Sequence, residues 1–239
     1  MKKTVLTLPG EDNQLMQEAY KTLRTNLQFC GKDTKAILFT SCMENEGKTV
    51  SVLGVARSFA ELGKKVLVID TDMRKSVMAG RNTDAENVKG LSEILTGLAE
   101  VEECIYSTQF ENFDLVFAGQ YPPNPAELLG SKEFSELLKS MRSQYDYVLI
   151  DSTPLGMVID AAIIAPICDG AVLVMRGTKV KHRLAQGVVD QLKMSGCKIL
   201  GVVRNGVNAG GGYGYGKGYG YGYGYGYGAY GKQDGKKKK

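Results

Sequence analysis

The segment Ser41–Thr49 constrains the fold more than any other part of the sequence. It ends in Gly-Lys-Thr, follows an apolar run at residues 36–40 and precedes a helical apolar pattern at residues 52–60. A strand, a loop ending in Gly-Lys-Thr and a helix together form the context of a P-loop, whose backbone N–H groups bind phosphate at a helix N-terminus. The segment therefore predicts a nucleotide site next to a central strand.

This P-loop departs from the common pattern G-x-x-x-x-G-K-[ST] at two positions. Cys42 replaces the first Gly, and Asn45 stands where a second loop Gly is common. Asn tolerates a positive φ better than most residues, so we expect the loop to fold. Lys48 should reach the β- and γ-phosphates and Thr49 should bind Mg²⁺. The residues expected to contact the nucleotide are Glu44, Asn45, Glu46, Gly47, Lys48, Thr49 and Val50.

Two further apolar runs end in carboxylates. Residues 65–69 lead into Asp70-Thr71-Asp72-Met73-Arg74, and residues 147–150 lead into Asp151. Ligands of open α/β sheets bind at the carboxyl ends of strands, although the first group could also form an ordinary turn. A strand ending in Asp is the usual Mg²⁺ partner of a P-loop, so Asp151 is a Walker B candidate.

Strand and helix patterns alternate along most of the chain. Further strands are expected at residues 113–119, 171–175 and 199–204, and further helices at 91–98, 126–141 and 180–195. Asp160 is expected to cap a helix that runs to Pro166. This alternation predicts an α/β fold, a doubly wound, mostly parallel sheet of P-loop NTPase type.

A helix is also predicted at about residues 11–29, before the P-loop. Its apolar face carries Leu15, Ala19, Leu23 and Leu27. Its polar side carries a stripe of three charges, Glu18, Lys21 and Arg24. Such a stripe is either a solvated face with internal ion pairs or a contact surface for another subunit.

The composition changes sharply at Gly210. Residues 1–209 are expected to form one globular P-loop domain, and residues 210–239 a disordered tail without branched aliphatics. The tail is either a low-complexity segment or an acceptor for repeated modification. It contains eight tyrosines: Tyr213, Tyr215, Tyr219, Tyr221, Tyr223, Tyr225, Tyr227 and Tyr230.

Charge and cysteine content exclude several classes of function. The net charge of +4 comes from the end of the chain, where six Lys and one Asp follow residue 212, so the body has no basic signature for nucleic acid. The five cysteines form no C-x-x-C pair, which disfavours zinc, and an odd scattered set suits a reducing cytoplasm. The single histidine, His182, is expected at the surface. The longest apolar stretch, residues 161–175, is too short to span a membrane.

Together these motifs resemble the bacterial tyrosine kinases that control capsule and exopolysaccharide synthesis. The likeness covers the P-loop, the Asp-x-Asp-x-Arg element at Asp70, the Walker B strand, the Pro-Pro-Asn-Pro-x-Glu-Leu-Leu segment at residues 122–129 and the Tyr-rich end. The family's ring-assembly motif, Glu-x-x-Arg-x-x-Arg, is similar to Glu18, Lys21 and Arg24. Lys21 replaces an Arg of that motif and loses its bidentate fork, and Glu44-Asn45 replace a Pro-Gly pair.

The resemblance implies an ATP- and Mg²⁺-dependent protein-tyrosine autokinase. Lys48 and Thr49 would act as above, Asp72 and Asp151 would orient the Mg²⁺ ligands, and Asp70 would accept the tyrosine proton. Asn205 is similar to an adenine-contacting Asn of the family. The eight tail tyrosines would be the sites of autophosphorylation.

The resemblance also implies partners and a location. Members of this type are cytoplasmic, assemble into rings, and are recruited to the inner face of the plasma membrane by a membrane-anchored activator of polysaccharide synthesis. A cognate tyrosine phosphatase is expected, and no nucleic acid. One rival is a partitioning or cell-division P-loop ATPase, but those proteins carry a signature Lys where this chain has Met43. Another is a non-enzymatic tail that stacks on RNA.

Overall fold

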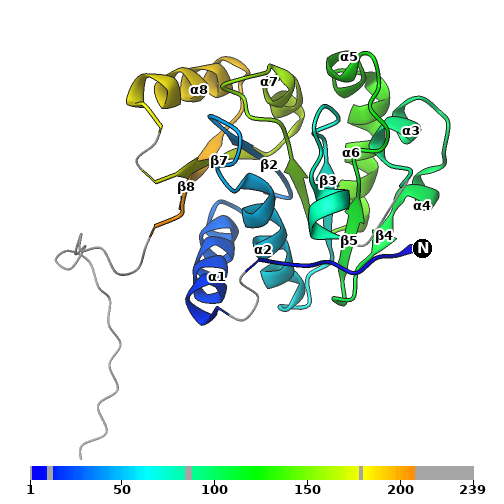
Figure 1. Cartoon of the computed structure of the whole chain (residues 1–239), viewed down its shortest axis with the longest axis horizontal. Helices are drawn as coiled ribbons and strands as arrows, with labels where there is room; N and C mark the ends of the chain where they lie inside the picture. The colour runs from blue at the N-terminus through cyan, green and yellow to red at the C-terminus, as the bar shows by residue number, and fades with distance from the viewer. Residues whose placement is uncertain (1, 10–12, 84–87, 178–179, 208–239) are drawn as a thin grey trace, which may run out of the picture. The chain divides into compact units, whose positions relative to one another are not determined.

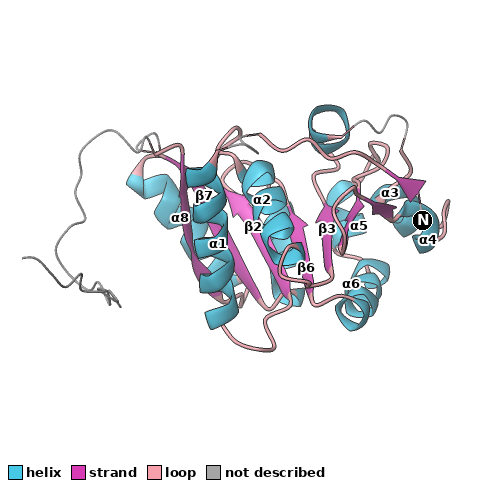
Figure 2. Cartoon of the chain, turned by 90° about the horizontal axis from the view of Figure 1, so that it is seen from below, coloured by secondary structure: helices cyan, strands magenta, loops and turns pink. Residues whose placement is uncertain are grey.

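The computed structural model describes residues 2–9, 13–83, 88–177 and 180–207. In these ranges the strands form one eight-stranded sheet with the order β1-β4-β5-β3-β6-β2-β7-β8. Figure 2 shows β7, β2, β6 and β3 side by side at its centre. The strands are β1 (Lys2–Lys3), β2 (Ala36–Ser41), β3 (Val66–Asp70), β4 (Tyr106–Ser107), β5 (Phe113–Val116), β6 (Tyr147–Asp151), β7 (Gly170–Arg176) and β8 (Ile199–Asn205).

Helices cover both faces of the sheet, as the doubly wound prediction requires. In Figure 1, α1 (Gln14–Phe29) and α2 (Lys48–Ala60) lie together on one side, and α5 (Pro125–Leu129), α7 (Asp160–Ile164) and α8 (His182–Met194) lie on the other. The remaining helical elements are a π-helix (Met78–Asn82), α3 (Leu91–Leu95), α4 (Val101–Cys104), α6 (Lys132–Gln144) and a 3₁₀ turn (Ala165–Ile167).

The central strands of this sheet are apolar because they pair in parallel and helices cover both faces of the sheet. Among the described strands only β4 and β5 pair antiparallel. Alternate residues of β2 enter opposite layers: Leu38 packs with α6, α7 and α8, whereas Ile37 and Phe39 pack with α2. Since both faces are covered, β2 is buried along its whole length. The predicted fold class is therefore confirmed.

Two helix predictions need correction. The helix expected at 126–141 is two helices, because Ser131 caps α6 with its hydroxyl, which accepts a hydrogen bond from Phe134 N at 3.3 Å. Asp160 is not a cap, since Ile159 holds that position and α7 begins at Asp160. The Asp160 carboxylate instead binds Arg74.

The first helix follows its predicted apolar face only in its second half, where Leu23 and Leu27 pack into the core. Asn13 caps α1 by accepting hydrogen bonds from the backbone N–H groups of residues 15 and 16, but the Leu15 side chain is 68% exposed. The contact with α2 runs through Tyr20, whose ring lies so close to Gly54 that a Cβ there would be 2.3 Å from it. The Tyr20 hydroxyl donates to the Val50 carbonyl at 3.4 Å. The first helix thus touches the first turn of the P-loop helix.

Some predictions fall outside these ranges. The tail at 210–239 and its eight tyrosines lie beyond the residues that the structure describes, as do residues 11 and 12 of the first predicted helix. Within the described ranges no helix is both long and apolar enough to cross a membrane.

Candidate functional site

The strand register brings the predicted acidic residues to the P-loop. β3 and β6 are neighbours, and Asp70 lies opposite Asp151. On the other side of β6, Phe39 of β2 lies opposite Asp151, two residues before the P-loop begins. Because parallel strands end at one edge of the sheet, the P-loop and both acidic turns meet there.

The P-loop takes the backbone shape that its sequence predicts. Asn45 has φ 60°, which confirms that it replaces a glycine in the left-handed region, and Gly47 caps α2 at φ 85°. The Glu46 carboxylate turns back into its own loop and accepts hydrogen bonds from Cys42 N at 2.8 Å and Met43 N at 2.9 Å. Glu46 therefore fixes the start of a loop that lacks its first glycine.

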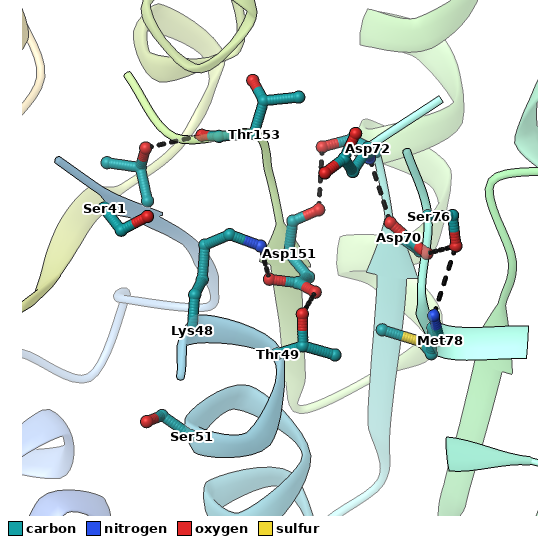
Figure 3. Close-up of polar contacts among 12 residues, drawn as sticks. Ser41, Lys48, Thr49, Ser51, Asp70, Asp72, Ser76, Met78, Asp151 and Thr153 are labelled. Carbon is teal, nitrogen blue, oxygen red and sulfur yellow. Dashed lines mark hydrogen bonds and ion pairs between the residues drawn. The ribbon is translucent and has the colours of Figure 1, made fainter. Parts of the chain in front are cut away.

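The two reactive side chains at the end of the P-loop converge on one carboxylate (Figure 3). Lys48 Nζ donates to Asp151 Oδ1, and Thr49 Oγ1 donates to Asp151 Oδ2 at 2.6 Å. Lys48 and Asp151 are both buried, so their opposite charges compensate each other in a poorly solvated place. Asp151 thus sets the positions of the cation and the hydroxyl that the motif requires.

The acidic turn after β3 carries two carboxyls in different surroundings, one buried (Asp70) and one that faces the cavity (Asp72). Asp70 is 1% exposed and accepts hydrogen bonds from Ser76 Oγ at 2.5 Å and Asp72 N at 3.0 Å. Burial, and then the nearby charge of Asp151, raises the pKa of Asp70 to about 7. Asp72 faces the cavity, and burial raises its pKa as well. Asp70 itself does not line the cavity.

The ends of β7 and β8 hold the other side of the P-loop. Asn205 Nδ2 donates to the Glu46 carbonyl at 2.9 Å, and a Cβ on Gly47 would lie 1.7 Å from that nitrogen. Arg176 N donates to Glu46 Oε1 at 3.3 Å, and its guanidinium reaches the Asn45 carbonyl at 3.4 Å. A glycine at position 47 is therefore required both by its φ and by the close approach of Asn205.

A cavity of about 410 Å³ opens over these groups, a size suited to a small-molecule ligand. All seven predicted loop residues, 44–50, line it together with Asp72. Arg74 of the predicted acidic turn also lines it, and so do residues that were not predicted to contact a ligand: Ser41, Met43, Lys75, Val77, Thr153, Pro154, Met157 and Val158. Their only signal in the sequence is their position just after the ends of β2, β3 and β6.

Two cations at this cavity already have partners. Arg74 forms a bidentate pair with the buried Asp160, with nitrogen–oxygen distances of 2.8 and 3.0 Å. Lys75 Nζ reaches Glu44 Oε2 at 3.1 Å, and both of these side chains are largely solvated. Arg74 is consequently held in place, whereas the Lys75–Glu44 pair contributes little to stability.

The residues present fit a magnesium nucleotide. Thr153 lines the cavity, and its buried Oγ1 has no hydrogen-bond partner in the described residues. No three His, Cys, Asp or Glu side chains in the described chain are grouped closely enough to hold a metal alone. Mg²⁺ commonly uses one or two carboxylates and takes its other ligands from phosphate and water. Thr49, Asp72 and Asp151 match that donor set.

The three charged residues predicted for oligomerisation, Glu18, Lys21 and Arg24, do not all face solvent in the structure. Lys21 Nζ pairs with Glu18 Oε1 at 2.7 Å, with both side chains largely exposed. Arg24 turns inward, and its Nη1 donates to the Ser58 carbonyl at 2.9 Å and to Ser58 Oγ at 3.2 Å. Lys21 and Glu18 are thus available at the surface of α1, while Arg24 ties α1 to α2.

The fold and the cavity define a P-loop nucleotide-binding protein. The AAA domain family matches residues 34–194. The chain is 42% identical over 189 residues to tyrosine-protein kinase CpsD of Streptococcus pneumoniae, covering 79% of this chain and 83% of that one. It is 35% identical over 208 residues to tyrosine-protein kinase YwqD of Bacillus subtilis, covering 86% and 87%. The chain therefore belongs to the bacterial tyrosine kinase family, a family of protein-tyrosine kinases.

Solved structures agree with this assignment. The kinase domain of Escherichia coli tyrosine kinase ETK is 31% identical and matches 85% of this chain and 80% of its own, with a TM-score of 0.77. The septum site-determining protein MinD from Pyrococcus horikoshii, complexed with Mg-ADP, is 28% identical and matches 70% of this chain and 68% of its own, with a TM-score of 0.59. The fold is thus shared with an ATPase class, and the likeness to the kinase domain is greater.

Proposed function

We propose that this chain transfers the γ-phosphoryl group of ATP to its own C-terminal tyrosines, from Tyr213 to Tyr230, and so regulates capsular or exopolysaccharide synthesis and export. The observation that carries the proposal is the convergence of Lys48 and Thr49 on Asp151 beneath a cavity of about 410 Å³. This arrangement is accompanied by eight tyrosines in the last part of the same chain.

Phosphate binding is assigned to the P-loop. Its backbone N–H groups and the N-terminus of α2 provide positive partial charge, and Lys48 adds a full charge. Lys48 now pairs with Asp151 and must turn toward the cavity to contact a phosphate. Thr153 Oγ1, which has no partner of its own among the described residues, is placed to donate to the nucleotide. Asn205, in contact with Glu46, is the proposed neighbour of the adenine.

The magnesium ligands are assigned to Thr49, Asp72 and Asp151. Mg²⁺ bound there would neutralise the charge that develops on the transferred phosphoryl group. Thr49 Oγ1 would bind the metal through a lone pair while its hydrogen still donates to Asp151 Oδ2, and the Asp151 carboxylate would orient the water ligands of the metal.

Asp70 is the proposed acceptor of the tyrosine proton, at Oδ2. Its raised pKa means that it holds a proton near neutral pH more readily than an exposed carboxylate does. Because Asp70 is buried, the Ser76 hydroxyl that now donates to Oδ2 must move aside before a tyrosine hydroxyl can approach. Asp72, which already lines the cavity, is the second candidate.

Assembly and partners belong to the same proposal. Glu18 and Lys21 at the surface of α1, with Arg24 behind them, would form part of a homo-oligomeric ring in which neighbours phosphorylate each other's tails. The kinase would work in the cytoplasm, recruited to the inner face of the plasma membrane by a membrane-anchored activator of polysaccharide synthesis. A cognate tyrosine phosphatase would reset the tails.

The rival function is that of a partitioning or cell-division P-loop ATPase, because the MinD structure shares the fold. Met43 stands where those proteins carry their signature Lys, and a Gly-Tyr repeat cannot form the amphipathic helix with which some of them end. Both features favour the kinase.

The test is tyrosine phosphorylation by a Lys48→Met variant. We expect full-length chain incubated with ATP and Mg²⁺ to carry phosphotyrosine between residues 213 and 230 by mass spectrometry. Lys48→Met should lose more than about 100-fold of this activity, because removing a preorganised charge at the transferred group costs about 3 kcal/mol or more.

Lys132→Met is the matched control. Lys132 lies on α6 with its side chain 83% exposed, so its removal should leave the phosphotyrosine yield unchanged. Phosphotyrosine at the wild-type level in Lys48→Met would reject the P-loop as the site of transfer.

A further inference from the structure

Two exposed methionines flank the mouth of the nucleotide cavity. Met43, in the P-loop, is 48% exposed, and Met157, after β6, is 54% exposed. Both line the cavity, where Pro154 and Val158 add further apolar surface. Together these side chains make an apolar rim at the solvent edge of the cavity, which the nucleotide chemistry above does not use.

A close backbone approach brings together the two segments that carry these methionines. Gly156 lies against the P-loop so closely that a Cβ on it would be 2.2 Å from the Cys42 carbonyl oxygen. Met43 follows Cys42 directly and Met157 follows Gly156, so the two side chains leave adjacent points of two different segments. We call this pair the methionine rim.

We propose that the methionine rim binds the ring of the acceptor tyrosine, supplied by the Gly-Tyr tail of a second copy of this chain. The inference rests on the proposed function and identifies how the site selects its acceptor. Methionine adapts its shape and makes favourable sulfur–aromatic contacts, which suits a rim that must accept eight different tyrosines in turn.

The sequence of the tail, and the point at which the described chain ends, both suit the tail to bind at the methionine rim. Each tyrosine from 219 to 227 has glycine on both sides, so no neighbouring side chain prevents the ring from entering between two methionines. The described chain ends at Val207, two residues after Asn205, which contacts the P-loop. The described part of the chain therefore ends close to the P-loop. A serine would leave the methionines exposed, so the rim favours tyrosine.

The experiment measures acceptor binding apart from nucleotide binding. The enzyme is the full-length chain with its eight tail tyrosines replaced by serine, and the substrate is a peptide of residues 213–223. Met43→Gln and Met157→Gln keep the length of the side chain and remove its apolar character. Each should raise the peptide KM roughly tenfold, the effect of losing about 1.4 kcal/mol, with little change in kcat.

Two controls accompany these variants. Met194→Gln alters a methionine that is 86% exposed at the end of α8, away from the lining of the cavity, and should leave the peptide KM unchanged. Met43→Leu and Met157→Leu keep an apolar rim and should restore the KM to within about threefold of wild type.

The outcomes separate the inference from the proposed function. If the unmodified chain forms no phosphotyrosine with ATP and Mg²⁺, the proposed function fails. If it does, but the glutamine variants keep the wild-type peptide KM, the methionine rim does not bind the acceptor. A rise in the dissociation constant of a fluorescent ADP analogue that matches the rise in peptide KM would instead place the methionines on the nucleotide and overturn the proposal.

Discussion

Asp70 is a buried carboxyl whose charged form is destabilised by its surroundings. It sits at the end of β3 opposite Asp151, and burial with that neighbouring charge raises its pKa from 3.8 to about 7. Hydrogen bonds from Ser76 and Asp72 only partly offset this. A carboxyl held in this way favours its protonated form, which is unusual for a structural aspartate and common at sites of proton transfer.

This raised pKa predicts how stability depends on pH. Between pH about 4 and 7 the folded chain binds a proton at Asp70 that the unfolded chain has released, so the free energy of unfolding falls as pH rises through this window. Asp70→Asn should remove that part of the slope, on the order of 1–3 kcal/mol between pH about 5 and 8. Urea unfolding at a series of pH values in EDTA measures this slope, and Asp190→Asn, at an exposed position, is the control. Parallel pH profiles for wild type and Asp70→Asn would contradict the assignment.

At the scale of elements, α1 is connected to the nucleotide site through α2. Tyr20 packs on Gly54 and donates to the Val50 carbonyl, and Arg24 donates twice to Ser58. α2 begins with Lys48 and Thr49 themselves. An event on the outer surface of α1, such as contact with another subunit, therefore lies one helix away from the P-loop.

Because Arg24 turns inward and Lys21 stays exposed on α1, removing their side chains should affect the stability of the chain differently. Arg24→Ala removes hydrogen bonds from a charged donor to a buried partner and should lower the free energy of unfolding by about 1–3 kcal/mol. Lys21→Ala breaks an exposed pair and should change it by less than about 1 kcal/mol. Denaturation midpoints measure both effects.

Light scattering on the same two proteins tests the ring. If Lys21 contributes to the subunit contact, Lys21→Ala should give a smaller particle than wild type while remaining fully folded. An unchanged particle mass for Lys21→Ala, together with an unchanged midpoint for Arg24→Ala, would show that the stripe is merely a solvated face.

At the scale of the whole molecule, most of the fold and of the candidate site could be predicted from the apolar periodicity of the sequence and from the acidic residues that end its apolar runs. The apolar runs ending at Asp70 and Asp151 are buried parallel strands, and parallel pairing alone brings their ends to the P-loop. The sequence could not reveal that Glu46 would bind its own loop, because that depends on loop shape. Nor could it show that Arg74 pairs with Asp160, because the two residues are 86 positions apart in the sequence.

The same limit explains the errors. Helical spacing predicts Leu15 on a buried face, but only a partner helix decides which face is buried, and α2 meets Tyr20 and Arg24 instead. The predicted helix at 126–141 keeps its apolar pattern across Gly130, which hides the break that Ser131 makes by capping α6.

The most direct test of the central claim is the fate of the γ-phosphoryl group. Full-length chain is mixed with a limiting amount of ATP and Mg²⁺, and ADP, free phosphate and phosphotyrosine are quantified over time in the same sample. A tyrosine autokinase predicts that phosphotyrosine and ADP appear in equal amounts with little free phosphate. If ADP and free phosphate rise together while no phosphotyrosine forms, the chain is an ATPase on a kinase-like fold, and its proposed function as a tyrosine autokinase is contradicted.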